Sequence, residues 1–198
     1  GFGFVEVGTI TPEPQYGNPK PRVFRLEEDE ALINRLGFNN IGSEKASNNI
    51  NSNAPKGLLG INIGPNKDTK NRIEDYLKCF RNLNHLGDYI TINISSPNTE
   101  NLRNFHNPKE LEELLNTLNE EKKKINSQIS IAVKISPDLS SKDLDIIGNI
   151  LLKNNIKFVI ISNTSDGIRE NLRNINKFEK GGLSGKPIEE KSNLLINE

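Results

Sequence analysis

Asp88-Tyr-Ile-Thr-Ile-Asn-Ile-Ser-Ser-Pro-Asn-Thr-Glu-Asn-Leu-Arg103 is the stretch that decides how this chain folds. Its β-branched start favours a buried strand, and the Ser, Pro and Asn that follow favour a turn. Ligands of parallel α/β proteins bind beyond the carboxyl ends of the strands. A capped turn without a ligand fits the same pattern, so the residues alone leave both readings open. The functional reading places these side chains at a ligand site: Asn93, Ser95, Ser96, Asn98 and Thr99.

Short β-branched runs recur along the chain, and amphipathic helical segments separate them. The runs cover residues 2–10, 58–63, 89–94, 129–135 and 158–161, and they are typical of parallel strands covered on both faces. Apolar residues at helical spacing follow Asn107-Pro108 and Ser140-Ser141, and Ile73, Leu77 and Phe80 indicate a third helix. The predicted fold class is therefore α/β. The predicted architecture is a (β/α)8 TIM-type barrel, incomplete here, with about five of its eight βα units.

Composition narrows the class of protein further. The 198 residues carry 26 Lys and Arg against 26 Asp and Glu, so the charge balance gives no indication of a nucleic-acid partner. No apolar run approaches the length of a transmembrane helix, and the single Cys79 predicts a reducing compartment. His85 and His106 are expected at the surface, and no metal site can be built from them. Residues 48–53 are expected to form a surface loop, and the run 120–124 a solvated helix face.

Asn93-Ile-Ser-Ser-Pro-Asn-Thr99 resembles the catalytic loop of the quinone-linked, membrane-associated class of dihydroorotate dehydrogenases. Further blocks resemble motifs of this family in the same order, up to about Pro187, and seven blocks in sequence are more specific than any one of them. The other six are Gly1-Phe-Gly-Phe-Val-Glu-Val-Gly-Thr-Ile-Thr-Pro12, Asn34-Arg-Leu-Gly-Phe-Asn-Asn40, Gly60-Ile-Asn-Ile-Gly64, Val133-Lys-Ile-Ser-Pro-Asp138, Ser162-Asn-Thr164 and Gly181-Gly-Leu-Ser-Gly-Lys-Pro187.

The resemblance implies an FMN-dependent oxidation of (S)-dihydroorotate to orotate, in de novo pyrimidine (UMP) biosynthesis, with electrons passed to a membrane quinone. It also implies that residues 1–198 are the central part of a single FMN-binding barrel domain. Relative to the family we expect the amino-terminal helices, the first barrel strand and the last two strands to be missing. Those helices would give peripheral association with the bacterial inner membrane, on its cytoplasmic side, or with the mitochondrial inner membrane. The alternative is a catalytically inactive, truncated remnant of the same barrel.

The resemblance also assigns roles to individual residues. Ser96 would be the catalytic base, with Thr99 or a bound water as a relay; a barrel of the soluble-acceptor class would carry a catalytic Cys in this loop instead. The residues implied to bind substrate are Asn34, Arg35, Leu36, Gly37, Phe38, Asn93, Asn98, Asn163 and Thr164. Those implied to bind the cofactor are Thr9, Asn62, Asn93, Lys134, Ser162 and Gly185.

Three local features bear on this assignment. Lys134 interrupts an apolar strand and needs an anionic or polar companion, which the family supplies as the flavin; the alternative is the water-facing side of an edge strand. The turn 181–185 is rich in glycine and is expected to offer backbone amides to an anion. Ser165-Asp166-Gly167 departs from the family pattern, so we expect a loop of different shape that keeps the contacts of Asn163 and Thr164.

Overall fold

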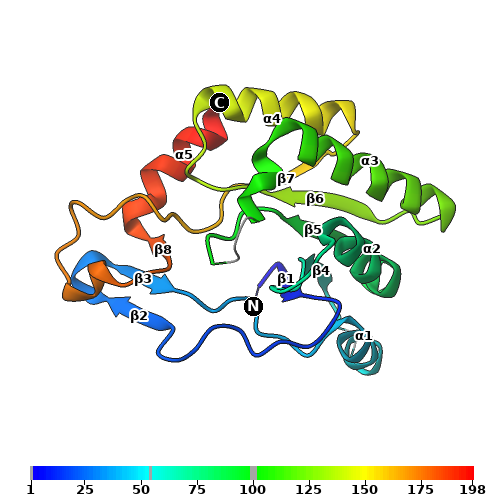
Figure 1. The fold of residues 1–198 in the computed structure, drawn as a ribbon, viewed down its shortest axis with the longest axis horizontal. Coiled ribbons are helices and arrows are strands. Elements are labelled where there is room, and N and C mark those ends of the chain that lie inside the picture. Colours follow the sequence, from blue (N-terminus) through cyan, green and yellow to red (C-terminus); the bar gives the residue numbers. More distant parts are fainter. Residues whose placement is uncertain (1, 54, 99–101) are drawn as a thin grey trace.

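A five-stranded parallel sheet forms the centre of the structure (Figure 1). The structure is a computed structural model, and it describes residues 2–53, 55–98 and 102–198. Within these ranges the strand order of the main sheet is β1-β4-β5-β6-β7, as expected for consecutive βα units. The strands are β1 (Phe4–Ile10), β4 (Leu58–Ile63), β5 (Tyr89–Asn93), β6 (Ser130–Lys134) and β7 (Phe158–Ile160). All five predicted strands are confirmed.

The three predicted helices are also confirmed, and two of them begin at the predicted caps. The Asn107 side chain accepts a hydrogen bond from Lys109 N at 3.0 Å, and Ser140 Oγ accepts one from Asp143 N at 3.2 Å. Each cap satisfies an amide that the first helical turn leaves unpaired. The helices are α1 (Ser43–Ser52), α2 (Arg72–Leu83), α3 (Pro108–Lys124), α4 (Ser141–Lys153) and α5 (Glu189–Asn197).

The two faces of the main sheet have different chemistry. Side chains alternate along a strand, and residues paired across parallel strands project to the same face. Isoleucine, leucine and valine occupy the face that α2, α3 and α4 cover, and they form the main core with Tyr76 and Phe80 (Figure 1). The opposite, inner face is largely apolar at the amino ends of the strands, where a cavity of about 480 Å³ lies against Phe4 and Tyr89. Toward the carboxyl ends of the strands this inner face becomes polar.

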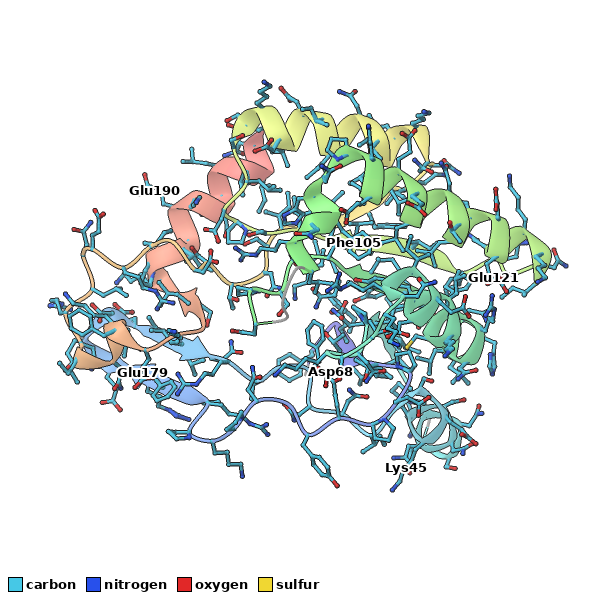
Figure 2. All side chains as sticks on the ribbon, viewed as in Figure 1. Lys45, Asp68, Phe105, Glu121, Glu179 and Glu190 are labelled. Carbon is cyan, nitrogen blue, oxygen red and sulfur yellow. The ribbon has the colours of Figure 1, made fainter. Side chains whose placement is uncertain are left out.

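A second sheet, which the sequence analysis did not predict, has three antiparallel strands. Two of them follow β1 in the sequence, and the third follows β7. The order of this sheet is β2-β3-β8, formed by Val23–Leu26, Ala31–Asn34 and Gly182–Gly185. Figure 2 labels Glu179 beside this sheet, at the opposite end of the molecule from Glu121. The segment 181–185, predicted as a glycine-rich turn, is instead a strand over Gly182–Gly185, where it pairs with β3 and Leu183 N donates to Ser165 O. The predicted contact of this segment with an anion stays a prediction.

Three further predictions about the surface are corrected: two concern α1 and α3, and the third concerns His106. Residues 48–53 are largely helical, since α1 extends to Ser52 and packs Ala46 and Ile50 against the core. Glu121, within the run 120–124, is buried because Arg81 binds it through two hydrogen bonds of 2.7 and 3.0 Å.

His106 is partly buried, whereas His85 is exposed as predicted. His106 lies in the short helix η2 (Leu102–His106), and its Nε2 is enclosed without a hydrogen-bond partner among the described residues. Burial, followed by the neighbouring Arg103 charge, lowers the pKa of His106 to about 4. The described residues contain no cluster of His, Cys, Asp and Glu suited to a metal ion.

Replacing Gly60 by alanine is expected to destabilise the protein by roughly 1–3 kcal/mol, because the added carbon would overpack the inner face. A Cβ at this position would lie 2.2 Å from Tyr89 Cζ. Chemical denaturation of Gly60→Ala, Tyr89→Ala and the double variant measures the coupling. Gly148→Ala is the control, because a Cβ at that position in α4 meets nothing within 4 Å. Strictly additive costs at positions 60 and 89 would contradict the predicted contact.

Candidate active site

Polar side chains from three neighbouring strands meet on the inner face at the carboxyl end of the sheet. Thr9 Oγ1 donates to Asn62 Oδ1 at 2.8 Å, and Asn93 Nδ2 donates to Thr9 Oγ1 at 3.0 Å and to Asn62 Oδ1 at 3.3 Å. Asn62 and Asn93 are each 4% exposed, so these bonds satisfy amides that water does not reach. The structure thus brings together three of the residues predicted to bind the cofactor.

A bulge in β1 allows Thr9 to join this group. Val7 pairs with Ile61 and Ile10 with Ile63, so β1 contains one more residue than β4 over this interval. The extra residue turns Thr9 to the same face as Glu6. Gly8 is required here, because it has φ of 131° and a Cβ would lie 2.4 Å from Asn62 O.

The predicted substrate residue Asn163 extends the polar group to the segment that follows β7. Its Nδ2 donates to Ser95 Oγ at 3.0 Å and to Asn93 Oδ1 at 3.3 Å, and its Oδ1 accepts from Thr164 N at 2.8 Å. Ser95 Oγ in turn donates to Asn93 Oδ1 at 3.3 Å. The ends of β5 and β7 are thereby joined, and β6 lies between them.

Ser96 lies in the loop that leaves β5 and is 5% exposed. Its Oγ accepts a hydrogen bond from Asn98 N at 3.2 Å, which is the turn contact that the local pattern alone predicts. A serine hydroxyl keeps one donor and a second lone pair after such a bond, so the turn contact is compatible with a role in chemistry. Thr99, the predicted relay, lies outside the described residues.

The second predicted substrate segment, residues 34–38, reaches the same loop through Asn34 and Asn98. Asn98 Nδ2 donates to Asn34 O at 3.0 Å, which holds the end of β3 against the loop after β5. The Arg35 guanidinium has other partners, since it binds Glu179 at 2.7 Å and lies 4.5 Å from the centre of the Phe24 ring. Leu36 is exposed, Gly37 has φ of 72°, and the Phe38 ring lies against Gly64.

Lys134 projects from the inner face beside Asn93, with which it pairs across β5 and β6. It is half-buried, and its Nζ has no hydrogen-bond or ion-pair partner in the part of the chain that the structure describes. The edge-strand alternative is wrong, because β6 lies between β5 and β7. A half-buried cation without a protein partner fits a negatively charged or electron-rich ligand, as a flavin would provide.

Two predicted cofactor residues lie apart from the asparagine group. Ser162 Oγ is hydrogen-bonded to Ser192 Oγ of α5 at 2.9 Å and donates to Asn163 O at 3.1 Å. Gly185 pairs with Ala31 at the end of β8 and has φ of 100°. Their contacts to a cofactor stay predictions.

Sequence reasoning missed an ionic clamp beneath these loops. Arg103 Nε donates to Ser95 O at 3.3 Å and Nη2 to Thr164 O at 3.2 Å, while Nη1 lies 2.7 Å from Asp166 and 3.2 Å from Asp138. One guanidinium therefore ties the loops after β5, β6 and β7. All of these residues lie in or beside quoted motifs, but their pairing joins positions that are far apart in sequence, which no local pattern reveals.

Asp138 is the acceptor at the centre of this clamp. Its carboxylate accepts from Ser165 Oγ at 2.6 Å and from Asp166 N at 3.1 Å, and Lys191 Nζ lies 3.3 Å away. Burial raises the pKa of Asp138, but these hydrogen bonds and the Arg103 charge outweigh burial and lower it to about 2. The unusual Ser165-Asp166 pair thus contributes to the clamp.

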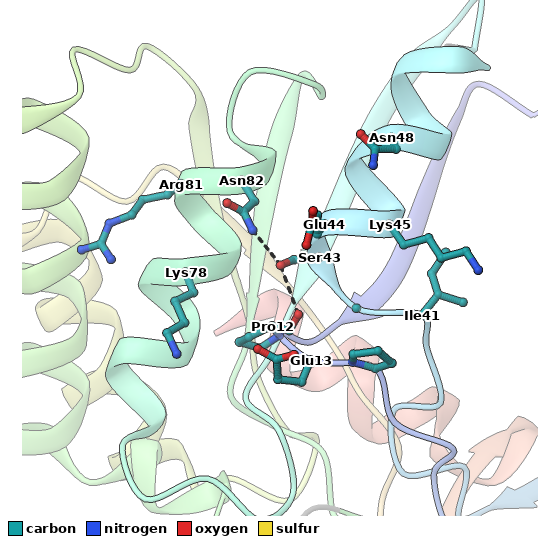
Figure 3. Close-up of a pocket in the computed structure, with 12 residues that line it drawn as sticks. Pro12, Glu13, Ile41, Ser43, Glu44, Lys45, Asn48, Lys78, Arg81 and Asn82 are labelled. Atoms are coloured by element: carbon teal, nitrogen blue, oxygen red, sulfur yellow. Dashed lines mark hydrogen bonds between the residues drawn. The ribbon is translucent and has the colours of Figure 1, made fainter.

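A cavity of about 550 Å³ lies between α1 and α2, separate from the polar group (Figure 3). Asn82 Nδ2 donates to Ser43 Oγ at 2.9 Å, and Ser43 Oγ donates to Pro12 O at 3.3 Å. Its charged lining is mixed, and Arg81 is already paired with Glu74 and Glu121. The strand ends, where buried amides converge beside a cation, are therefore the better candidate.

A parallel α/β-barrel sheet with its polar site at the carboxyl ends of the strands defines a class of barrel proteins that bind ligands there. The chain belongs to the dihydroorotate dehydrogenase family, whose model matches residues 1–198. This confirms the resemblance on which the sequence prediction depends. The family is flavin-dependent.

Individual relatives agree with this assignment. The dihydroorotate dehydrogenase (quinone) of Nitrosomonas europaea is 46% identical over 205 residues, covering 100% of this chain and 60% of that protein. Its namesake from Buchnera aphidicola is 48% identical, with the same coverage. A crystal structure of ligand-free DHODH from Eimeria tenella is 36% identical with a TM-score of 0.93, over 99% of this chain and 61% of that one. The chain thus spans about 60% of the length of the curated relatives it matches.

Asp138→Asn is expected to lower the free energy of unfolding at pH 7 by about 2 kcal/mol, because the charged form of this carboxylate is stabilised in the folded protein. A depressed folded pKa contributes stability above the unfolded pKa of about 4, and that stability is lost as pH falls toward 2. Melting temperatures of the two proteins should therefore converge between pH 4 and pH 2. Asp145→Asn, at an exposed position of α4, is the control. A constant difference across this range would contradict the assignment.

Proposed function

We propose that the whole protein is an FMN-dependent dihydroorotate dehydrogenase that oxidises (S)-dihydroorotate to orotate in de novo UMP synthesis and passes the electrons to a quinone. In this proposal residues 1–198 are the central part of a single FMN-binding barrel domain. One observation carries it: Asn62, Asn93 and Asn163 converge at the strand ends, beside Ser95-Ser96 and beside Lys134, which has no partner among the described residues. Family membership supplies the reaction that this arrangement would serve.

The amides suit a flat ligand with an alternating polar edge. Asparagine offers a donor and an acceptor in one rigid group, which matches the N–H and C=O groups of a pyrimidine or an isoalloxazine. We assign Thr9, Asn62, Asn93 and Lys134 to FMN, and Asn93, Asn98 and Asn163 to the substrate. Lys134 would stabilise negative charge on the pyrimidine edge of the flavin.

Oxidation of dihydroorotate removes a proton from C5 and a hydride from C6. Ser96 takes the C5 proton in this proposal and later releases it to solvent. Bound FMN would accept the hydride. A serine hydroxyl is a weak base, so its environment must exclude water, and its 5% exposure agrees with that requirement. Asn98 N donates to this oxygen at 3.2 Å and so holds it in position.

The quinone partner and peripheral membrane association, at a bacterial or a mitochondrial inner membrane, are proposed from the relatives whose names include the quinone. Among the described residues the helices are all too short or too polar to cross a bilayer. The inactive-remnant alternative is not better supported, because the side chains of Thr9, Asn62, Asn93 and Asn163 form one connected group.

Ser96→Ala is expected to lower kcat by at least ~100-fold while FMN content is unchanged, because the variant lacks the base and keeps the amides. Orotate formation with a quinone or a dye acceptor measures this in the whole protein. Ser136→Ala is the matched control: Ser136 Oγ accepts from Asp138 N at 3.1 Å, the same turn contact in the neighbouring loop. A fully active Ser96→Ala protein would rule out Ser96 as the base.

A further inference from the structure

The proposed function leaves one charged group of the inner face without a role. Glu6 lies on β1, closer to the amino ends of the strands than the asparagines. Hydrogen-bond donors from neighbouring strands surround its carboxylate. Asn62 Nδ2 donates to Oε1 at 2.9 Å, and Thr91 Oγ1 donates to Oε2 at 2.7 Å. Tyr89 approaches from β5, where burial, followed by the Glu6 charge, raises the pKa of its hydroxyl to about 12.

A carboxylate partner decides which way an asparagine amide is turned. An ionised carboxylate only accepts, whereas an amide can turn either its donor or its acceptor toward a neutral neighbour. Asn62 must therefore turn its NH₂ to Glu6, and its Oδ1 is left facing Thr9 Oγ1 and Asn93 Nδ2.

The same constraint passes to the next amide. Because Asn62 presents an acceptor, Asn93 must turn its Nδ2 toward it, which leaves Asn93 Oδ1 facing the Ser95 hydroxyl and Asn163 Nδ2. In this series of hydrogen bonds each amide therefore donates to the next group, from Asn163 to Asn93, from Asn93 to Asn62 and from Asn62 to Glu6. If Asn62 were turned over, its NH₂ would face the NH₂ of Asn93, and two buried donors would oppose each other.

We propose that Glu6 is a positioning residue that fixes the orientation of the Asn62 and Asn93 amides, and so decides which donors and acceptors the site presents to the flavin and the pyrimidine. This inference rests on the proposed function for the identity of the ligands. Glu6 acts through the asparagines.

The carboxylate and the amide at positions 6 and 62 can be exchanged, which gives a sharp test. Glu6→Gln places a group that donates or accepts beside Asn62, so the orientation is no longer fixed. Asn62→Asp places two carboxylates against each other. In the double variant the new amide at position 6 donates to one oxygen of the new carboxylate at position 62, and the other oxygen still accepts from Thr9 and Asn93. Net charge is then restored, and position 62 again presents an acceptor to Thr9 and Asn93, although the hydrogen bond between positions 6 and 62 runs in the opposite direction.

In the whole protein we expect each single variant to weaken FMN or orotate binding by roughly tenfold or more, since a hydrogen bond to a charged group is lost. Because Asn62 is itself assigned to FMN, the double variant is compared with Asn62→Asp, and it should bind both ligands more tightly than that single variant. FMN binding is read from quenching of flavin fluorescence, and orotate binding from the flavin absorbance change. Thr91→Val is the control: it removes the other strong donor to Glu6 and leaves Asn62 in place, so binding should change less than about threefold.

Glu6→Gln binding both ligands as the wild type does would overturn the proposal, as would a double variant that binds them no more tightly than Asn62→Asp. Failure of both Glu6→Gln and the double variant to fold would assign Glu6 a purely structural role and also overturn it. A wild-type whole protein that binds FMN but does not oxidise dihydroorotate would instead refute the proposed function, and the two failures are thereby separated.

Discussion

Residues that pair across neighbouring parallel strands project to the same face of the sheet, and the candidate site depends on this constraint. The register places Asn93 beside Lys134 and Asn62 beside Thr91, two residues before Asn93 on β5, while Thr9 reaches the group through the bulge in β1. The other face carries the isoleucines that the helices bury. Shifting one strand by a single residue would exchange the two sets and remove both the core and the site.

Buried amides are costly unless they are paired, and here they pair largely with one another. This satisfies the desolvated groups without a bound ligand and keeps the donors and acceptors in fixed places, so little ordering remains when a ligand binds. Two charged groups hold these amides and the loops around them. Glu6 accepts a hydrogen bond from Asn62, and Arg103 donates to the backbone carbonyls of Ser95 and Thr164. Lys134, without such a partner among the described residues, is the group that most needs a ligand.

Periodicity and capping residues were enough to predict the parallel strands and three helices, because these elements depend on local pattern and on burial. The β2-β3-β8 sheet escaped prediction because its strands are four residues long and two of them are separated from the third by about 150 residues. Motifs indicated Asn62, Asn93 and Asn163, whereas Arg103 and Asp138 were missed because their partners are distant in sequence. Glu6, like Lys134, is a charged residue within a largely apolar strand. The same criterion could therefore have identified Glu6 from the sequence.

We propose that the inner face at the strand ends binds the flavin and the pyrimidine together. A crystal structure of the whole protein with FMN and orotate tests it most directly. We expect FMN against Thr9, Asn62 and Lys134, orotate against Asn98 and Asn163, and Ser96 Oγ facing C5 of the pyrimidine. Density for both ligands elsewhere, for instance in the cavity between α1 and α2, with the asparagines bonded only to each other, would contradict it.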